Sequence, residues 1–136
     1  MDLIFEIGRI MFALLFIGGG IGHFQDRAAM VAYGKTRGAP VPELVVPLTG
    51  VVIIAGGLGV MLGVFPDLAA LALAFFLLPT AFIMHAFWTI SDPKEKMFER
   101  AQFMKNIALC GGALVLFWVF VTAGDRTPYT ITGPLL

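Results

Sequence analysis

Charged side chains are scarce in this chain and make up 13% of its 136 residues, whereas a soluble domain carries roughly 25%. Acidic and basic residues balance at nine each without a basic run, so nothing indicates nucleic acid as a partner. The single cysteine, Cys110, lies in the apolar run ALCGGALVLF, which excludes a disulfide framework and a thiolate metal cluster. No carboxylate pair, Ser/His/Asp set, phosphate loop or metal-ligand spacing is present. The residues alone therefore name no reaction.

Hydrophobic residues, in contrast, make up 59% of the chain and gather in four long stretches. Each stretch approaches the roughly 20 residues that a helix needs to cross a bilayer. The first one carries Asp2 and lacks a small-x-small cleavage site, so we interpret it as a retained helix and not a signal peptide. We predict an all-α integral membrane four-helix bundle, antiparallel and up-down, that forms one transmembrane domain over residues 1–136. The predicted spans are 3–22, 44–65, 68–90 and 103–123.

Two of the connections have readable turn chemistry. Only Pro66 and Asp67 separate the second and third spans, which predicts a tight hairpin with Pro66 ending one helix and Asp67 capping the next. In the longer connection of residues 23–43, Asp26 is a candidate N-cap for a short helix through Lys35 that lies at the membrane interface.

The other polar connection, residues 91–102, carries closely spaced charges. Side chains three and four apart are neighbours on a helix surface. We therefore interpret this segment as a solvated helical extension of the fourth span, in preference to a binding motif. The charged residues concerned are Glu95, Lys96, Glu99 and Arg100.

Lys and Arg are distributed unevenly between the two sides of the predicted bundle. The two longer connections carry six of them, whereas the opposite side has only Arg126 in the tail. The positive-inside rule then places both long connections in the cytoplasm and both termini outside, N-out and C-out. The six residues are Arg27, Lys35, Arg37, Lys94, Lys96 and Arg100.

Glycines mark candidate helix contacts, because membrane helices associate where small residues let two backbones approach. They recur in three of the four spans, which favours a packed bundle, and we predict that Gly59 and Gly63 lie against another helix. The candidate contact residues are Gly18 with Gly22, Gly59 with Gly63, and Gly111 with Gly112.

Ionisable and polar residues within the spans are few. Glu6 and Arg9 share one face of the first helix and are candidates for an intramembrane ion pair; the alternative is that both snorkel to the outer boundary.

A second polar group comes from three spans and meets at the predicted cytoplasmic end. We predict that it lines one ligand-binding pocket, although polar residues also gather wherever helices leave the membrane. Two histidines on different helices are also a pattern for b-type haem, which we disfavour because His23 lies outside the apolar zone. The ligand-binding candidates are His23, His85, Gln102, Lys105 and Asn106; catalytic residues are not identified and no metal site is predicted.

Five segments together resemble the DoxX family of small four-helix bacterial membrane proteins. They are GRIMFALLFIGGGIGHFQD, AAMVAYGKTRGAPVP, GGLGVMLG, FIMHAFW and QFMKNIALCGGALVL, and they cover nearly the whole chain. This chain has His23, Ile53 and Gln102 where the family pattern often has Lys, Glu and His. The resemblance implies a multi-pass protein of the bacterial cytoplasmic (inner) membrane and a redox-linked role, because some relatives are subunits of thiosulfate:quinone oxidoreductases.

Our leading hypothesis is a small membrane subunit of a quinone-linked or thiol- and sulfur-linked redox assembly. It would hold a quinone headgroup or a sulfur oxyanion near His85 and Lys105 and would not be catalytic alone, because nothing here carries electrons without a cofactor. Its expected partners are the lipid bilayer and either another protein or further copies of the chain. The alternative is a non-catalytic accessory or anchoring subunit; a transporter or channel ranks third because the spans hold few polar residues.

Overall fold

The computed structural model describes residues 1–136 and is helical, with no β-strand. Four helices are long and apolar enough to cross a membrane, which confirms the predicted all-α fold. They are α1 (Asp2–Gln25), α3 (Pro42–Leu62), α4 (Pro66–Met84) and α5 (Pro93–Ala123). The shorter elements are α2 (Arg27–Thr36) and the 3₁₀ turns η1 (Phe87–Thr89) and η2 (Gly124–Arg126).

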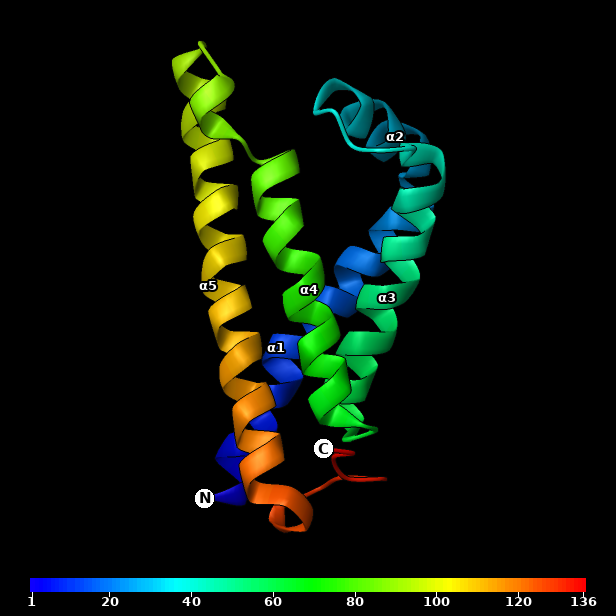
Figure 1. The fold of residues 1–136 in the computed structure, drawn as a ribbon, viewed down its shortest axis with the longest axis vertical. Coiled ribbons are helices and arrows are strands. Elements are labelled where there is room, and N and C mark those ends of the chain that lie inside the picture. The colour runs from blue at the N-terminus through cyan, green and yellow to red at the C-terminus, as the bar shows by residue number, and fades with distance from the viewer.

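Consecutive long helices run antiparallel, and the closely packed pairs are α1 with α3, α3 with α4, and α4 with α5. Both chain termini lie at one end of the bundle, which we call the terminal end (Figure 1). Helix α2 and the connection from α4 to α5 lie at the other end, which we call the connection end. Helix α1 meets α5 near the terminal end, where the Phe5 and Phe120 rings pack edge to face with centroids 6.0 Å apart.

The hairpin between α3 and α4 differs in detail from its prediction. Pro66 is the first residue of α4 and does not end α3, since a residue without an N–H fits the first turn of a helix. Asp67 makes no capping bond; it is fully buried, and its Oδ2 accepts hydrogen bonds from the backbone N–H groups of Leu135 and Leu136, at 3.0 and 2.8 Å. The carboxylate that we predict to cap α4 therefore binds the backbone of the C-terminal tail instead.

Helix α4 ends at Met84, before the predicted limit of the third span at residue 90. The chain then turns so that the rings of Phe87 and Trp88 pack against Phe103 of α5, with centroids 5.5 and 5.6 Å apart. Edge-to-face aromatic pairs stabilise a structure beyond the area they bury. This packing offsets the helical hydrogen bonds that the chain gives up.

The two polar connections form the predicted short helix and the predicted helical extension. Helix α2 follows Asp26 and runs one residue past Lys35, but the Asp26 side chain makes no capping bond; the backbone N–H of Asp26 closes the last turn of α1. Helix α5 already begins at Pro93, with Asp92 Oδ1 accepting the backbone N–H of Glu95 at 2.8 Å, which confirms the helical extension of the fourth span.

The helix contacts at glycine are only partly those expected. A Cβ atom at Gly59 would come within 2.6 Å of the Ala69 Cβ in α4, so the prediction for Gly59 is confirmed. Gly63 faces Thr130 of the C-terminal tail and not a helix, so its prediction is wrong. Helix α1 approaches α3 through Gly20, two residues from each of the expected Gly18 and Gly22. The predicted contacts within the bundle are wrong at Gly18, Gly22 and Gly111, where an added Cβ atom would meet no atom within 4 Å.

Arg9 joins three parts of the chain at the terminal end and is fully buried. Its guanidinium donates to the carbonyl oxygens of Val60, Met61 and Pro128, each at 2.9 Å, and Glu6 lies 2.9 Å away as an ion pair. Carbonyls in the last turn of a helix have no partner within that helix. Arg9 supplies partners for those of α3 and ties the C-terminal tail across them, so neither Arg9 nor its charge faces lipid.

Candidate functional site

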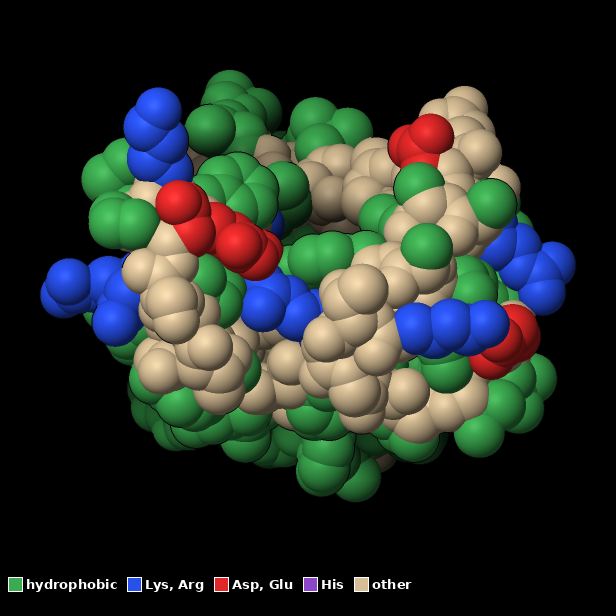
Figure 2. Space-filling view, turned by 90° about the horizontal axis from the view of Figure 1, so that it is seen from above, with side chains coloured by type: hydrophobic (Ala, Val, Ile, Leu, Met, Phe, Trp, Pro, Cys, Tyr) green, Lys and Arg blue, Asp and Glu red, His purple; other side chains and the backbone are tan.

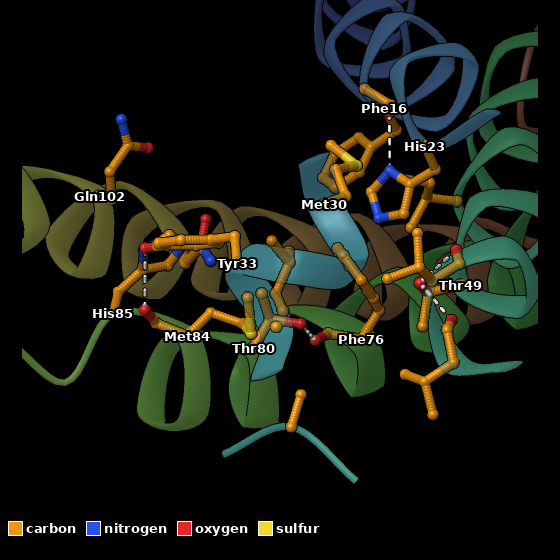
Figure 3. Close-up of a pocket in the computed structure, with 18 of the residues that line it drawn as sticks. Phe16, His23, Met30, Tyr33, Thr49, Phe76, Thr80, Met84, His85 and Gln102 are labelled. Atoms are coloured by element: carbon orange, nitrogen blue, oxygen red, sulfur yellow. Dashed lines mark hydrogen bonds between the residues drawn. The ribbon is translucent and has the colours of Figure 1, made fainter. Parts of the chain in front are cut away.

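A cavity of about 340 Å³ lies toward the connection end, between the pair α1 and α3 and the pair α4 and α5. Seen from that end, the molecule is hollowed between its two halves, with charged side chains on both sides of the hollow (Figure 2). The lining of the cavity is largely apolar, and polar side chains lie between the apolar ones (Figure 3). The apolar lining includes Leu15, Phe16, Ile53, Phe76, Leu77 and Leu109.

All five residues predicted to bind a ligand line this one cavity. Lys105 is exposed at the rim, where its Nζ donates to Oε1 of Gln102 at 2.5 Å. Asn106 is only 5% exposed, and its side chain makes no hydrogen bond to the protein. His23 and His85 approach from opposite sides of the cavity, at the ends of α1 and α4 (Figure 3). That a ligand binds here stays a prediction.

His85 is held by a residue that the sequence places elsewhere. Its Nδ1 lies 2.7 Å from Glu99 Oε2, and Glu99 is only 2% exposed. The prediction that Glu99 belongs to a solvated face is therefore wrong, whereas Glu95, Lys96 and Arg100 are exposed as expected. The reason is that the Glu99 face of α5 turns inward, toward α2 and the end of α4.

Glu99 also binds two residues from the α2 region. The Tyr33 hydroxyl lies 2.5 Å from Glu99 Oε1 and 3.2 Å from the carbonyl oxygen of Met84, and Arg37 forms an ion pair with Glu99 at 2.8 Å. The Arg37 guanidinium also lies 5.3 Å from the centre of the Tyr33 ring. We call Tyr33, Arg37, His85 and Glu99 the Glu99 cluster. It links α2 to both α4 and α5 across the mouth of the cavity.

The electrostatics of the Glu99 cluster favour a neutral phenol and a charged guanidinium. Burial raises the pKa of Tyr33, and the hydrogen bond to Glu99 raises it further. Burial works against the charge of Arg37, but its contacts with Tyr33 and Glu99 outweigh that effect, so the pKa of Arg37 is raised. Glu99 can therefore act as a carboxylate that accepts hydrogen bonds from its neighbours.

His23 is oriented by its own helix. Its Nδ1 lies 2.8 Å from the carbonyl oxygen of Gly19, and its ring packs edge-on against Phe76 of α4 with centroids 6.3 Å apart. The other ring nitrogen, Nε2, makes no hydrogen bond within the protein and the residue lines the cavity (Figure 3).

Sequence reasoning did not identify Tyr33, Arg37 or Glu99 as parts of the site. Tyr33 and Glu99 are 66 residues apart, so no local spacing relates them. The available signal was the tyrosine itself, one of two in the chain, in an otherwise apolar and basic segment.

The structure contains no group of three or more His, Cys, Asp or Glu side chains that could hold a metal ion. The groups that remain to hold an organic cofactor are the histidines and Asn106.

Comparison with known proteins places the chain in a family. The DoxX family model matches residues 4–86, which cover α1 to α4 and the turn after it. The chain is 34% identical over 110 residues to the inner membrane protein YqjF of Escherichia coli (strain K12), an alignment that covers 81% of this chain and 78% of YqjF. The inner membrane protein YphA of the same organism is 29% identical over the same shares of each chain. No solved structure matches.

These matches agree with the fold. Both relatives are named as inner membrane proteins, and four helices of this chain are long and apolar enough to cross a bilayer. The predicted multi-pass location in the inner membrane is confirmed. On the family match over more than half of its length, and on its identity to YqjF, the chain belongs to the DoxX family.

Proposed function

We propose that this protein is the small membrane subunit of a redox assembly and that its cavity holds the headgroup of a quinone-type molecule. The observation that supports this best is Asn106, a cavity-lining residue that is only 5% exposed and whose side chain makes no hydrogen bond to the protein. In an empty cavity only water can meet that amide. A ligand with a polar edge and an apolar ring replaces the water and gains the apolar wall as well.

Between the two ligand classes expected from the sequence, the charges favour the quinone. A sulfur oxyanion needs cations close to it, and Lys105 is the one Lys or Arg that lines the cavity. It is exposed and already bonded to Gln102, while Arg37 is neutralised by Glu99. A neutral planar ring demands no such cation and packs well against Phe16 and Phe76.

The connection end faces the cytoplasm in this proposal. It carries the six Lys and Arg residues of the two long connections, and only Arg126 lies in the tail at the other end. A cysteine introduced at Lys35 in a Cys110→Ala background tests the orientation. It should resist an impermeant thiol reagent in intact cells and react after the membrane is opened; labelling in intact cells contradicts the proposed orientation.

Electrons must come from another protein, because the chain has no group that carries them without a bound cofactor. An accessory role without a ligand is the second candidate. It is favoured by Gly18 and Gly22, which lie four apart on α1; a Cβ atom added at either would meet no atom within 4 Å, which leaves room for a helix of another protein.

Binding of decylubiquinone to the detergent-purified protein, followed by calorimetry, tests the first candidate. We expect saturable binding that Asn106→Leu weakens by roughly tenfold, the worth of one good hydrogen bond in a buried site. Ala108→Leu is the matched control, because it adds the same side chain to an exposed position of α5 outside the cavity. Absence of binding, with a partner protein still retained from native membranes, favours the accessory role.

A further inference from the structure

Most polar side chains of the cavity already donate their hydrogen-bonding protons to other groups of the protein. Thr49 and Thr80 both line the cavity, and their hydroxyls donate to backbone carbonyls of their own helices (Figure 3). Thr49 Oγ1 lies 2.8 Å from the carbonyl oxygen of Val45, and Thr80 Oγ1 lies 2.6 Å from that of Phe76. A hydroxyl has a single proton, so each threonine can offer a ligand only the lone pairs of its oxygen.

Both histidines also use their Nδ1 atom in a hydrogen bond within the protein. A carbonyl oxygen can only accept, so His23 must donate from Nδ1 to Gly19. Glu99 also accepts from Tyr33 and pairs with Arg37, so it is a carboxylate and accepts the Nδ1 proton of His85. A neutral imidazole with its proton on Nδ1 carries a lone pair on Nε2. In its neutral form each histidine therefore presents an acceptor to the cavity as well.

Donors that remain are few and lie mostly at the rim. Gln102 and Lys105 are bonded to one another there, and Lys105 is exposed to water. Asn106 is the buried side chain of the lining that still has donor hydrogens, and its amide oxygen is one more acceptor. The interior thus offers acceptors on several sides against a single buried donor group.

From this imbalance we propose that the cavity selects the hydroxyl-bearing, reduced form of its ligand, a quinol, over the oxidised quinone. The proposal rests on the quinone-type ligand of the proposed function and adds the redox state that is bound. A quinol donates a hydrogen bond from each ring hydroxyl, which His23, His85 and the threonines can accept. A quinone carbonyl facing the same lone pairs leaves them unpaired and repelled, the situation that makes hydrogen-bonding sites reject analogues lacking the donor.

Calorimetry under anaerobic conditions at neutral pH tests the proposal with two probes, decylubiquinol and decylubiquinone. We expect the quinol to bind roughly tenfold more tightly or better, as one or more hydrogen bonds in a buried site are worth. Equal affinities, or tighter binding of the quinone, overturn this inference and leave the proposed function standing. If neither probe binds, the proposed function fails and the inference fails with it.

Two variants examine whether the named acceptors cause the preference. Thr80→Val and His23→Phe each replace one acceptor with an apolar side chain of similar shape. Each should therefore reduce the preference for decylubiquinol over decylubiquinone severalfold. Thr122→Val is the matched control: Thr122 makes the same bond to its own helix, 2.7 Å to the carbonyl oxygen of Trp118, but lies outside the cavity. If none of the three substitutions changes this preference, the assignment of the acceptors is contradicted.

Discussion

His85 Nδ1 lies 2.7 Å from Glu99 Oε2, and this contact joins the end of α4 to α5 across the turn that connects them. The same carboxylate holds Tyr33 and Arg37 from the α2 region. One residue thus fixes the orientation of a cavity-lining imidazole and closes α2 over the cavity mouth. Its removal should therefore affect both stability and the site.

Glu99→Leu should lower the free energy of unfolding by about 3 kcal/mol, the usual cost of removing one partner from a buried charge pair. The loss arises because Arg37 and His85 stay enclosed without the carboxylate. Glu95→Leu is the control, since Glu95 has a side chain 55% exposed and lies 3.6 Å from Arg37. Its loss should cost less than about 1 kcal/mol. Chemical unfolding in detergent measures both, and equal small losses contradict the role of Glu99.

Tyr33 should titrate above the ordinary phenol pKa of 10.0, because burial and the bond to Glu99 favour its neutral form. The chain has two tyrosines, so phenolate absorbance in a Tyr129→Phe background reports Tyr33 alone. Glu99→Gln removes the carboxylate and should lower the midpoint. A midpoint at or below 10.0 in the Tyr129→Phe protein contradicts the buried contact.

The same shift has a consequence for stability. Because the folded state raises the pKa of Tyr33, the unfolded chain releases this proton first as the pH rises. The stabilising contribution of the neutral phenol is complete below the unfolded pKa and is lost progressively above it. Tyr33→Phe should remove this part of the alkaline loss of stability, which unfolding curves at increasing pH will measure.

Arg9→Lys should destabilise the bundle by about 3 kcal/mol, although it keeps the charge, because a single ammonium cannot reproduce a planar fork that serves several carbonyls. The backbone oxygens of Val60, Met61 and Pro128 could no longer all keep a donor. Arg126→Lys is the control, since the Arg126 side chain is exposed and reaches only the carbonyl of Ala123 in its own turn, at 3.4 Å. A thermal melt in which both variants match the parent protein contradicts the central role of Arg9.

Gly59→Ala and Gly18→Ala should change stability in opposite directions. In an open helix position, alanine is better than glycine by up to about 1 kcal/mol, so Gly18→Ala should stabilise slightly. At Gly59 the new methyl group would lie 2.6 Å from Ala69 and force α3 and α4 apart, which costs about 1–3 kcal/mol. Melting temperatures that move together would show that Gly59 does not mark a close contact.

The sequence by itself determined the features that depend on short-range patterns. Four apolar stretches predict four membrane helices, because backbone groups in hydrocarbon must bond within their own segment. Asp26 and the charges of residues 91–102 predict the short α2 and the extension of α5 for equally local reasons. The depth of His85 and Asn106 also follows, since two antiparallel helices joined at one end must bring these residues to similar levels.

Tertiary structure alone decided which face each helix turns inward. One residue along a helix rotates the side chain by about 100°, so local spacing did not distinguish the open Gly18 from the packed Gly20. The same rotation buries Glu99 while Glu95 and Arg100 stay in solvent. Asp67 and Arg9 bind tail residues 68 and 119 positions away, and Glu99 binds Tyr33 of α2, 66 positions away. Contacts over such separations depend on how helices pack, and no local pattern encodes that packing.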